Sequence, residues 1–241
     1  MKISSKLKEL ISKTEDVLYP HYSCPFCETE TIDGTVCDSC KQYFILPNFC
    51  NKCSEHVGGD ATLCIQCKDT DRIFDQSFSV VHYTEKVSAS VHKLKFGGGK
   101  YLALDFAKLL AEKFKTLNLS IDIVTYVPSH AKRIKERGYN QAKEIAENFC
   151  KIVDLPCAKL LDKTKDTAHQ TELTKAERLK NLENSFAITD KWLVKNKSIL
   201  VIDDVFTTGS TMSACAKVLK KAKANKVYGL TLAKTKLNIN R

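Results

Sequence analysis

The sequence lacks any apolar run long enough to cross a membrane. Hydrophobic residues make up 43% of the chain, which is an ordinary share for a soluble protein. No stretch approaches the roughly 18 apolar residues that a membrane helix needs. Residues 1–11 are amphipathic and lack the apolar core of a secretory signal peptide. We therefore expect a cytoplasmic protein with no membrane span.

The sequence also lacks the G-x-x-x-x-G-K-[ST] pattern, which excludes a P-loop nucleotide site, and residues 1–70 contain no arginine. Residues 1–70 carry a net charge of −3, whereas residues 71–241 carry a net charge of +13. A basic surplus of this kind favours polyanions such as nucleic acid or phosphorylated substrates. It also serves solubility in a lysine-rich protein, so charge alone leaves both interpretations open.

Residues 198–213, with the sequence SILVIDDVFTTGSTMS, say most about function. Four apolar residues at 199–202 predict a buried parallel strand. Two carboxylates, Asp203 and Asp204, follow where we expect this strand to leave the core. Apolar residues then recur at helical spacing after residue 211. Between the acids and this helix lies a loop of small residues: Thr207, Thr208, Gly209, Ser210 and Thr211.

A strand, an acidic pair, a hydroxyl-rich loop and a helix in this order can bind a sugar phosphate. A helix N-terminus offers unpaired N–H groups and a partial positive charge to a phosphate. Gly209 lets the backbone approach the phosphate closely, and the neighbouring hydroxyls add donors. Asp203 and Asp204 can accept hydrogen bonds from vicinal hydroxyls or hold Mg²⁺ through its water shell. The pattern therefore predicts a site for a ribose 5-phosphate.

Two other interpretations fit part of this run. Any strand of an α/β protein can end in Asp and cap the next helix with Ser or Thr, but a cap needs only one such residue. A response-regulator receiver domain also carries an Asp pair after a strand. Its pair lies early in the domain, however, whereas only one further candidate strand, residues 226–233, follows here. The ribose 5-phosphate interpretation accounts for the whole run.

Eight of the eleven cysteines form four C-x-x-C pairs: Cys24/Cys27, Cys37/Cys40, Cys50/Cys53 and Cys64/Cys67. Two such knuckles complete a tetrahedral zinc site with four thiolate ligands, and disulfides are a poor alternative in a cytoplasmic protein. We therefore expect two structural zinc ions that replace a hydrophobic core in this short segment, with an iron–sulfur cluster or redox dithiols as the alternatives. Sequential pairing of the knuckles uses the shortest loops, but the spacing does not exclude interleaved pairing.

Apolar periodicity predicts the remaining elements. We expect helices at residues 1–20, 85–95, 100–117 and 140–153. We expect strands at residues 72–83, 121–127, 160–161 and 186–188, with the last returning to the main sheet. The polar stretch 162–184 is typical of a lid over a site, with a helix possible at residues 173–182.

The strand at residues 121–127 runs into a segment suited to a multiply charged anion. Ser129 and His130 come first, and four basic residues follow: Lys132, Arg133, Lys135 and Arg137. Arg133 and Arg137 share a face if this segment is helical. A solvated basic turn is the simpler alternative. Upstream, the basic residues around His92 can merely complement the dipole at a helix C-terminus.

Three motifs and the cysteine pattern give the chain a family resemblance. The run at 198–213 resembles the phosphoribosyl-pyrophosphate (PRPP) signature of type I phosphoribosyltransferases. The motifs V-P-x-H-x-x-R-x-x-x-R-G-[FY]-N-Q-A at 127–142, H-K-L-K-F-x-G at 92–98 and Q-x-x-L-x-x-x-x-R-x-x-N at 170–181 resemble those of the ComF competence-protein family. The four knuckles ahead of such a domain match this family as well. One departure is that lysines stand before Gln170 where this family often has arginine, which leaves the phosphate contact of the lid open.

The resemblance implies a fold and a site. The fold class is α/β: a Rossmann-like type I phosphoribosyltransferase fold with a parallel sheet, plus a small N-terminal zinc-ribbon domain with four-cysteine sites. We expect an N-terminal helix at residues 1–20, a double zinc ribbon at 21–70 and the transferase-like domain at 71–241. By resemblance, the 5-phosphate binds Thr207–Thr211 and the ribose hydroxyls bind the catalytic-site pair Asp203 and Asp204. Pyrophosphate with Mg²⁺ lies near Ser129, His130, Arg133 and Arg137.

Two functions are implied. The first is a PRPP-binding protein that assists import of single-stranded DNA during natural transformation, with DNA-import proteins as partners. The second is an active, Mg²⁺-dependent phosphoribosyltransferase with an unknown acceptor, acting through an oxocarbenium-like state by clamping charge and positioning the acceptor. Only about eight residues follow the last expected strand, so we expect no C-terminal hood for base recognition, which disfavours nucleobase salvage.

Overall fold

The computed structural model describes residues 22–32, 34–45, 49–59, 61–70, 72–96, 98–164 and 185–235. They belong to two compact units, Met1–Gln42 and Tyr43–Arg241. The helix expected at residues 1–20 and the lid residues 165–184, with the Q-x-x-L motif, lie outside the described residues. No helix among the described residues is long and apolar enough to span a membrane.

The first unit is built around two cysteine knuckles. Ser23 and Glu30 form an antiparallel bridge, and inside it the amide of Cys24 donates to the carbonyl of Thr29 at 2.8 Å. The second knuckle leads into the short helix α2, Asp38–Lys41. Both turns bring their cysteine pairs to one point, as expected of a small metal-stabilised module.

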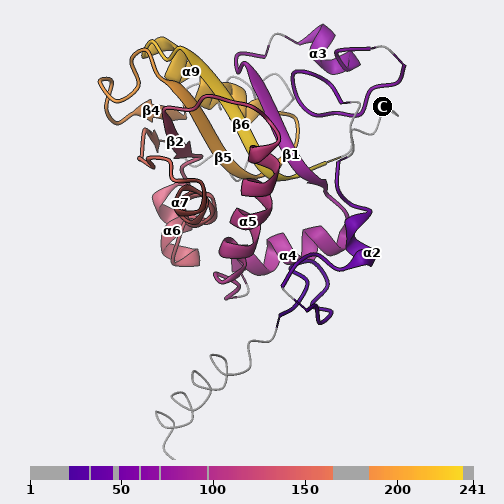
Figure 1. The fold of residues 1–241 in the computed structure, drawn as a ribbon. Helices are drawn as coiled ribbons and strands as arrows, with labels where there is room; N and C mark the ends of the chain where they lie inside the picture. Colours follow the sequence, from indigo (N-terminus) through magenta and orange to yellow (C-terminus); the bar gives the residue numbers. More distant parts are fainter. Residues whose placement is uncertain are drawn as a thin grey trace, which may run out of the picture. The chain divides into compact units, whose positions relative to one another are not determined.

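The second unit contains a four-stranded parallel sheet in the order β1-β6-β5-β2 (Figure 1). Its strands are β1 (Gln76–His82), β2 (Ile123–Tyr126), β5 (Ser198–Phe206) and β6 (Lys226–Lys234). The apolar runs that predicted these strands are buried on both faces, as a parallel sheet requires. The α/β fold class with a parallel sheet is confirmed.

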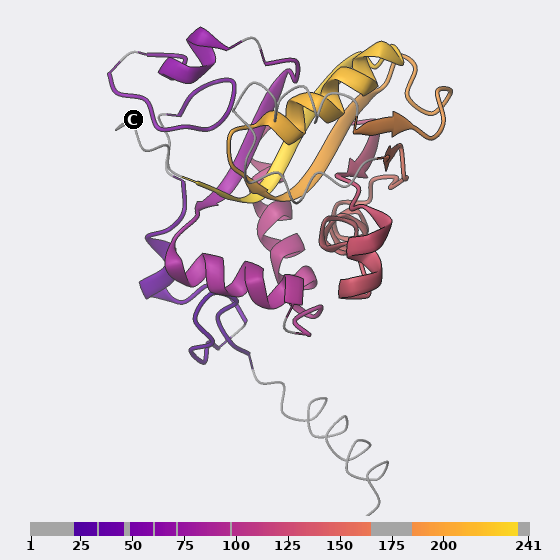
Figure 2. The ribbon, with the colours of Figure 1, turned by 180° about the vertical axis from the view of Figure 1, so that it is seen from behind.

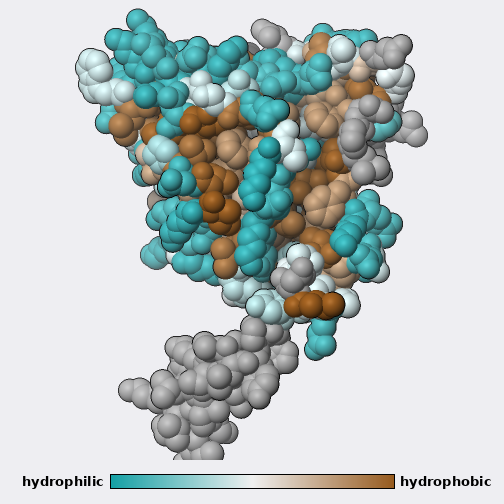
Figure 3. Space-filling model, in the orientation of Figure 1, coloured by the Kyte–Doolittle hydropathy of each residue, from teal (hydrophilic) through white to brown (hydrophobic). Residues whose placement is uncertain are grey.

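Helices cover both faces of this sheet. α9 (Ser210–Lys221) lies on one face, and α5 (Leu102–Lys115) and α7 (Gln141–Val153) lie on the other, as the two opposite views agree (Figures 1 and 2). α4 (Glu85–Phe96) and α6 (Ala131–Arg137) lie on the same side as α5. In Figure 3, hydrophilic residues cover the region of α9, which is the solvent side of that layer. Each crossover therefore returns the chain to the amino edge of the sheet, so that all four parallel strands end at the same carboxyl edge.

The expectation that residues 186–188 return to the main sheet is wrong. β4 (Phe186–Ile188) pairs with β3 (Leu161–Lys163) in a separate antiparallel sheet of two strands. The outer edge of β2 is already used at Val124, whose amide donates to Pro156 and whose carbonyl accepts from Ala158. An edge occupied in this way leaves no row of free backbone groups for another strand.

The second cysteine group belongs to the core of the larger unit. Cys50, Cys53 and Cys64 are buried in the same apolar cluster as Phe74 and Phe206. The fourth ligand position, Cys67, lies on the short helix α3, Ile65–Asp69. The sequence placed both knuckle pairs in one module at residues 21–70, whereas the compact units divide between Gln42 and Tyr43. The boundaries at residues 20 and 70 remain predictions about independently folding parts.

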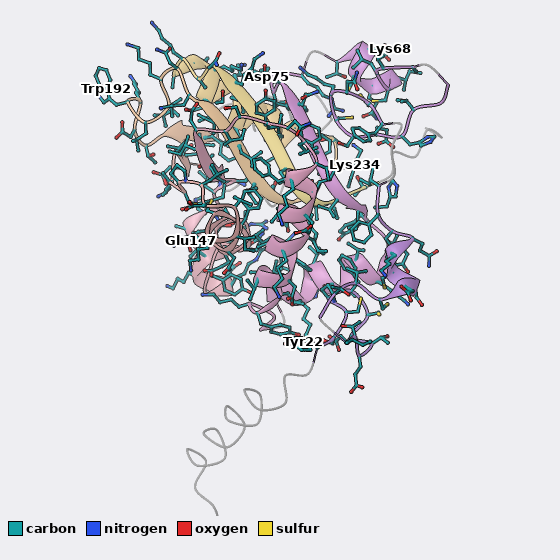
Figure 4. The ribbon with its side chains drawn as sticks, viewed as in Figure 1. Tyr22, Lys68, Asp75, Glu147, Trp192 and Lys234 are labelled. Atoms are coloured by element: carbon teal, nitrogen blue, oxygen red, sulfur yellow. The ribbon has the colours of Figure 1, made fainter. Side chains whose placement is uncertain are left out.

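Asp75 joins β1 to β6 and α9 at the amino edge of the sheet (Figure 4). Its carboxylate accepts from the amide of Val227 at 2.8 Å and lies 2.8 Å from Lys220 Nζ and 3.1 Å from Lys226 Nζ. Burial by itself raises the pKa of Asp75, but these donors outweigh it and hold the pKa below its usual value. The charged carboxylate therefore stabilises the folded state at every pH above its unfolded pKa of about 3.9.

We expect Asp75→Asn to lower the free energy of unfolding at pH 7 by roughly 1–3 kcal/mol, because it removes a charged acceptor from three donors. Asp105→Asn is the control. Burial raises the pKa of Asp105 despite the nearby Lys108, so its charge does not stabilise the fold and its neutral isostere should cost nothing. Urea denaturation measures both variants, and equal stability of the two would contradict this account of Asp75.

Candidate functional site

The loop between β5 and α9 has the geometry of an anion site. Gly209 is the N-cap of α9 and has a left-handed φ of 79°, a conformation that glycine adopts without strain. Thr208 Oγ1 lies 2.7 Å from Ser210 Oγ and accepts from the Ser210 amide at 3.3 Å. Thr207 and Thr208 are exposed. The N–H groups at the helix N-terminus and these hydroxyls can together bind a phosphoryl group.

The acidic pair lies inside β5 and not beyond it. β5 continues to Phe206, and Asp203 pairs in register with Thr231 of β6. The expectation that the strand leaves the core at residue 202 is therefore wrong, because β6 is long enough to pair with β5 past the acids. Each carboxylate also accepts the next backbone amide, from Asp204 and Val205 respectively, at 2.9 Å.

The two carboxylates face opposite sides of the sheet, as successive strand residues must. Asp203 lines a small hollow with Thr211 and Met212 of α9, and burial together with the charge of Asp204 raises its pKa well above the usual value. Asp204 faces α4 and is 5% exposed. The two carboxyl groups nevertheless stay close enough to interact, because Asp204 acts on Asp203 through its charge and through a side-chain hydrogen bond.

Lys95 is a site residue that the sequence analysis did not identify. Its Nζ forms an ion pair with Asp204 Oδ2. It lies in the last turn of α4, inside the H-K-L-K-F-x-G motif, where basic residues were interpreted as complements of the helix dipole. The motif marked this segment as one of interest in the sequence. The ion pair with Asp204 became visible only in the structure, where α4 lies beside β5.

The segment after β2 reaches the same edge of the sheet, because Tyr126 of β2 is in register with Ile202 of β5. Ser129 and His130 are half-buried, and His130 Nδ1 caps α6 by accepting from the Lys132 amide at 3.4 Å. The segment that follows His130 is helical and forms α6. Its Arg133 and Arg137 are half-buried, whereas Lys132 and Lys135 are exposed.

The α6–α7 connection is fixed to α4 and β2 by side-chain contacts. Tyr139 Oη donates to the carbonyl of Leu94, so this ring has a packing role. The Arg137 guanidinium lies 4.5 Å from the centre of the Phe96 ring and donates to Gln141 Oε1 at 3.3 Å. Burial, together with the charge of Arg133, lowers the pKa of Arg137. Asn140 caps α7 and donates to the carbonyl of Val127 at 3.0 Å. These contacts bring the basic segment beside Lys95.

Both cysteine groups can hold a metal ion. The knuckles pair sequentially, and within each group of four the Sγ atoms all lie within 4.8 Å of one another. Cys27 and Cys37 are 3.4 Å apart, and Cys53 and Cys64 are 3.7 Å apart. A tetrahedron with metal–sulfur bonds of about 2.3 Å has edges of about 3.8 Å, so these four-sulfur sets fit a tetrahedral ion. The other three cysteines, Cys150, Cys157 and Cys215, belong to neither group.

Comparison with known proteins agrees with this geometry. Residues 101–236 match the family model of the phosphoribosyl transferase domain. The chain is 27% identical over 208 residues to competence protein F of Haemophilus influenzae, with 82% of this chain and 90% of that protein covered. It is 26% identical over 216 residues to competence protein ComFC of Bacillus subtilis, with coverage of 84% and 85%.

Among solved structures, the allosteric regulatory enzyme of purine biosynthesis is similar in part. It is 18% identical, with a TM-score of 0.38, and the similar region covers 54% of this chain. The chain spans only 25% of the length of that structure.

We expect Lys95→Met to lower the free energy of unfolding by about 2 kcal/mol, because it leaves the buried Asp204 carboxylate without its cation. The double variant Lys95→Met/Asp204→Asn should recover most of this loss, since it also removes the charge. Lys86→Met, at an exposed position of the same helix, is the control. Denaturant unfolding of the wild type, Lys95→Met, Asp204→Asn and the double variant gives the interaction free energy between the two side chains. A value near zero would contradict the ion pair.

Proposed function

The chain belongs to the phosphoribosyl transferase domain family and is a ComF family protein, and from this premise we propose that it binds PRPP and assists the uptake of single-stranded DNA. The single observation that carries the proposal is the unit formed by β5, its acidic pair, the loop at residues 207–211 and α9. This unit combines an anion-binding loop with carboxylates at the carboxyl edge of a parallel sheet, where ligands of such sheets bind.

We propose that each group of the ligand meets a different part of this edge. The 5-phosphate binds the loop Thr207, Thr208, Gly209, Ser210 and Thr211. The ribose hydroxyls bind near Asp203 and Asp204, and the pyrophosphate lies near Ser129, His130, Arg133 and Arg137. Mg²⁺, when bound with PRPP, neutralises part of the pyrophosphate charge. Lys95 keeps Asp204 in place and adds a cation at the same edge.

Phosphoribosyl transfer to an acceptor is the second candidate function, and the match to the transferase domain favours it. The residues above would then orient the ribose and clamp the leaving pyrophosphate. Release of pyrophosphate from PRPP that depends on an added acceptor would establish this activity. Saturable PRPP binding without such release would leave PRPP as a ligand of a DNA-handling protein.

We propose zinc for both cysteine groups. Four thiolates at tetrahedral spacing are the ligand set that structural zinc prefers, and the separations given above support it.

The competence-protein names of two relatives support a cytoplasmic role beside the DNA-import proteins. The basic surplus of residues 71–241 and the exposed Lys132 and Lys135 supply a surface that favours a phosphate backbone.

We expect Thr208→Val/Thr211→Val to weaken binding of PRPP with Mg²⁺ by roughly tenfold or more, because hydrogen bonds to a charged phosphate are lost. Thr116→Val is the control, since the Thr116 hydroxyl donates to the backbone carbonyl of Lys113 at the end of α5, outside the proposed site. Titration calorimetry gives both affinities. Unchanged affinity of the double variant would refute the assignment of the 5-phosphate to this loop.

We expect Lys132→Glu/Lys135→Glu to weaken binding of single-stranded DNA and to flatten its salt dependence, because fewer counterions are released. Lys108→Glu/Lys115→Glu makes the same change of charge at exposed positions of α5 and should have a smaller effect. Fluorescence anisotropy at several salt concentrations measures both, with PRPP as a competitor. Salt-insensitive binding, or equal losses in the two variants, would contradict this DNA surface.

A further inference from the structure

Arg72 is a buried cation at the base of the loop between β5 and α9. The residue is 5% exposed and lies between the second cysteine group and β1 in the sequence. Its Cζ is 5.8 Å from the centre of the Phe74 ring and 5.5 Å from that of Phe206. Phe206 is the last residue of β5 and directly precedes Thr207. The two rings therefore hold the guanidinium against the start of the loop.

Gly209 shows how close this contact is. A Cβ atom built on Gly209 would lie 2.3 Å from Arg72 Nη1 and 2.6 Å from the Phe206 ring. The turn that begins α9 therefore leaves no room for a side chain on the Arg72 side. Glycine at this position adopts the left-handed conformation without strain, and its lack of a side chain leaves room for the guanidinium beside the loop.

The guanidinium has donors that no described residue satisfies. Nη2 donates to Gln66 Oε1 at 3.3 Å, whereas Nε and Nη1 are buried and have no hydrogen-bond partner among the described residues. Arg72 also interacts electrostatically with Cys67, but this interaction leaves the buried Nε and Nη1 donors without an acceptor, which is costly. An oxyanion with several acceptor oxygens is the partner that guanidinium donors match best, and the adjacent loop is suited to a phosphoryl group.

Gln66 connects Arg72 to the second cysteine group. It lies on α3 between Cys64 and Cys67, so its position depends on how these two thiolates are held. A metal ion bound by both would fix α3 and with it the Gln66 oxygen that accepts from Arg72. Release of the ion would free α3 and remove the tether of the guanidinium.

We propose that Arg72 is a ligand of the phosphoryl group at the loop 207–211 and is held there by the second cysteine group, so that metal binding at Cys50, Cys53, Cys64 and Cys67 raises the phosphate affinity of the loop. The inference rests on the proposed function, because it takes the same loop as the phosphate site. It adds a ligand outside the loop and gives the metal centre a second role besides stabilising the fold.

The first test measures binding of ribose 5-phosphate to the full chain by calorimetry, with zinc content determined for every variant. Arg72→Met should weaken binding by about tenfold or more, and Arg72→Lys should restore part of it because a cation remains. Gln66→Leu should also weaken binding while both metal ions are kept. Lys52→Met, whose ammonium lies over the same Phe74 ring at 5.7 Å, is the matched control and should bind like the wild type.

The second test uses the reciprocity of coupled sites and needs only the wild-type chain if Arg72→Met fails to fold. Ribose 5-phosphate should slow the loss of one of the two zinc ions to a colorimetric chelator, and Arg72→Met should remove this protection. Unchanged ribose 5-phosphate affinity in folded Arg72→Met, or zinc loss that the ligand does not slow, overturns the inference alone. A wild-type chain that binds neither ribose 5-phosphate nor PRPP overturns the proposed function and the inference with it.

Discussion

Two adjacent carboxylates inside a buried strand are the constraint on which the rest of the site depends. Because β5 continues past Asp203 and Asp204, both carboxylates lie within the packed sheet and interact with each other, so that their charge needs compensation from the surrounding elements. Lys95 of α4 supplies a cation to Asp204 on one face. On the other face, burial beside α9 raises the pKa of Asp203. The placement of α4 is therefore an electrostatic requirement of the strand as well as a matter of packing.

The same edge of the sheet gathers positive charge from segments far apart in the sequence. Lys95 comes from α4, Arg137 from α6 and Arg72 from the segment before β1. Lys234, at the end of β6, is buried over the Phe206 ring at 4.3 Å and lies 3.3 Å from Glu55 (Figure 4). The segments that carry Lys95, Arg137 and Lys234 follow the carboxyl ends of parallel strands, and the Arg72 side chain reaches the same loop from the segment before β1. Lys95 and Lys234 are paired with carboxylates, whereas Arg72 keeps donors without a partner among the described residues.

The second cysteine group differs from the first in what surrounds it. Cys50, Cys53 and Cys64 are buried among the apolar side chains of the transferase-like unit, whereas the first group belongs to a separate compact unit. Equal C-x-x-C spacing thus serves two purposes. The first group lies in a small compact unit, and the second is a part of the core of the larger unit.

The sequence by itself determined the α/β class, the parallel strands, the helix after Gly209 and the metal-binding capacity of the knuckles. Each of these depends on local periodicity or on short fixed spacings. Only the tertiary structure decided that β5 continues through Asp203 and Asp204, that residues 186–188 pair with β3, that Lys95 meets Asp204 and that Arg72 meets Gly209. The length of β5 depends on pairing with β6, and the charge contacts join segments that lie far apart in the chain, so no local pattern records them. Tertiary packing therefore decides which of the chain's charged residues and strands become partners, and it can override local propensity.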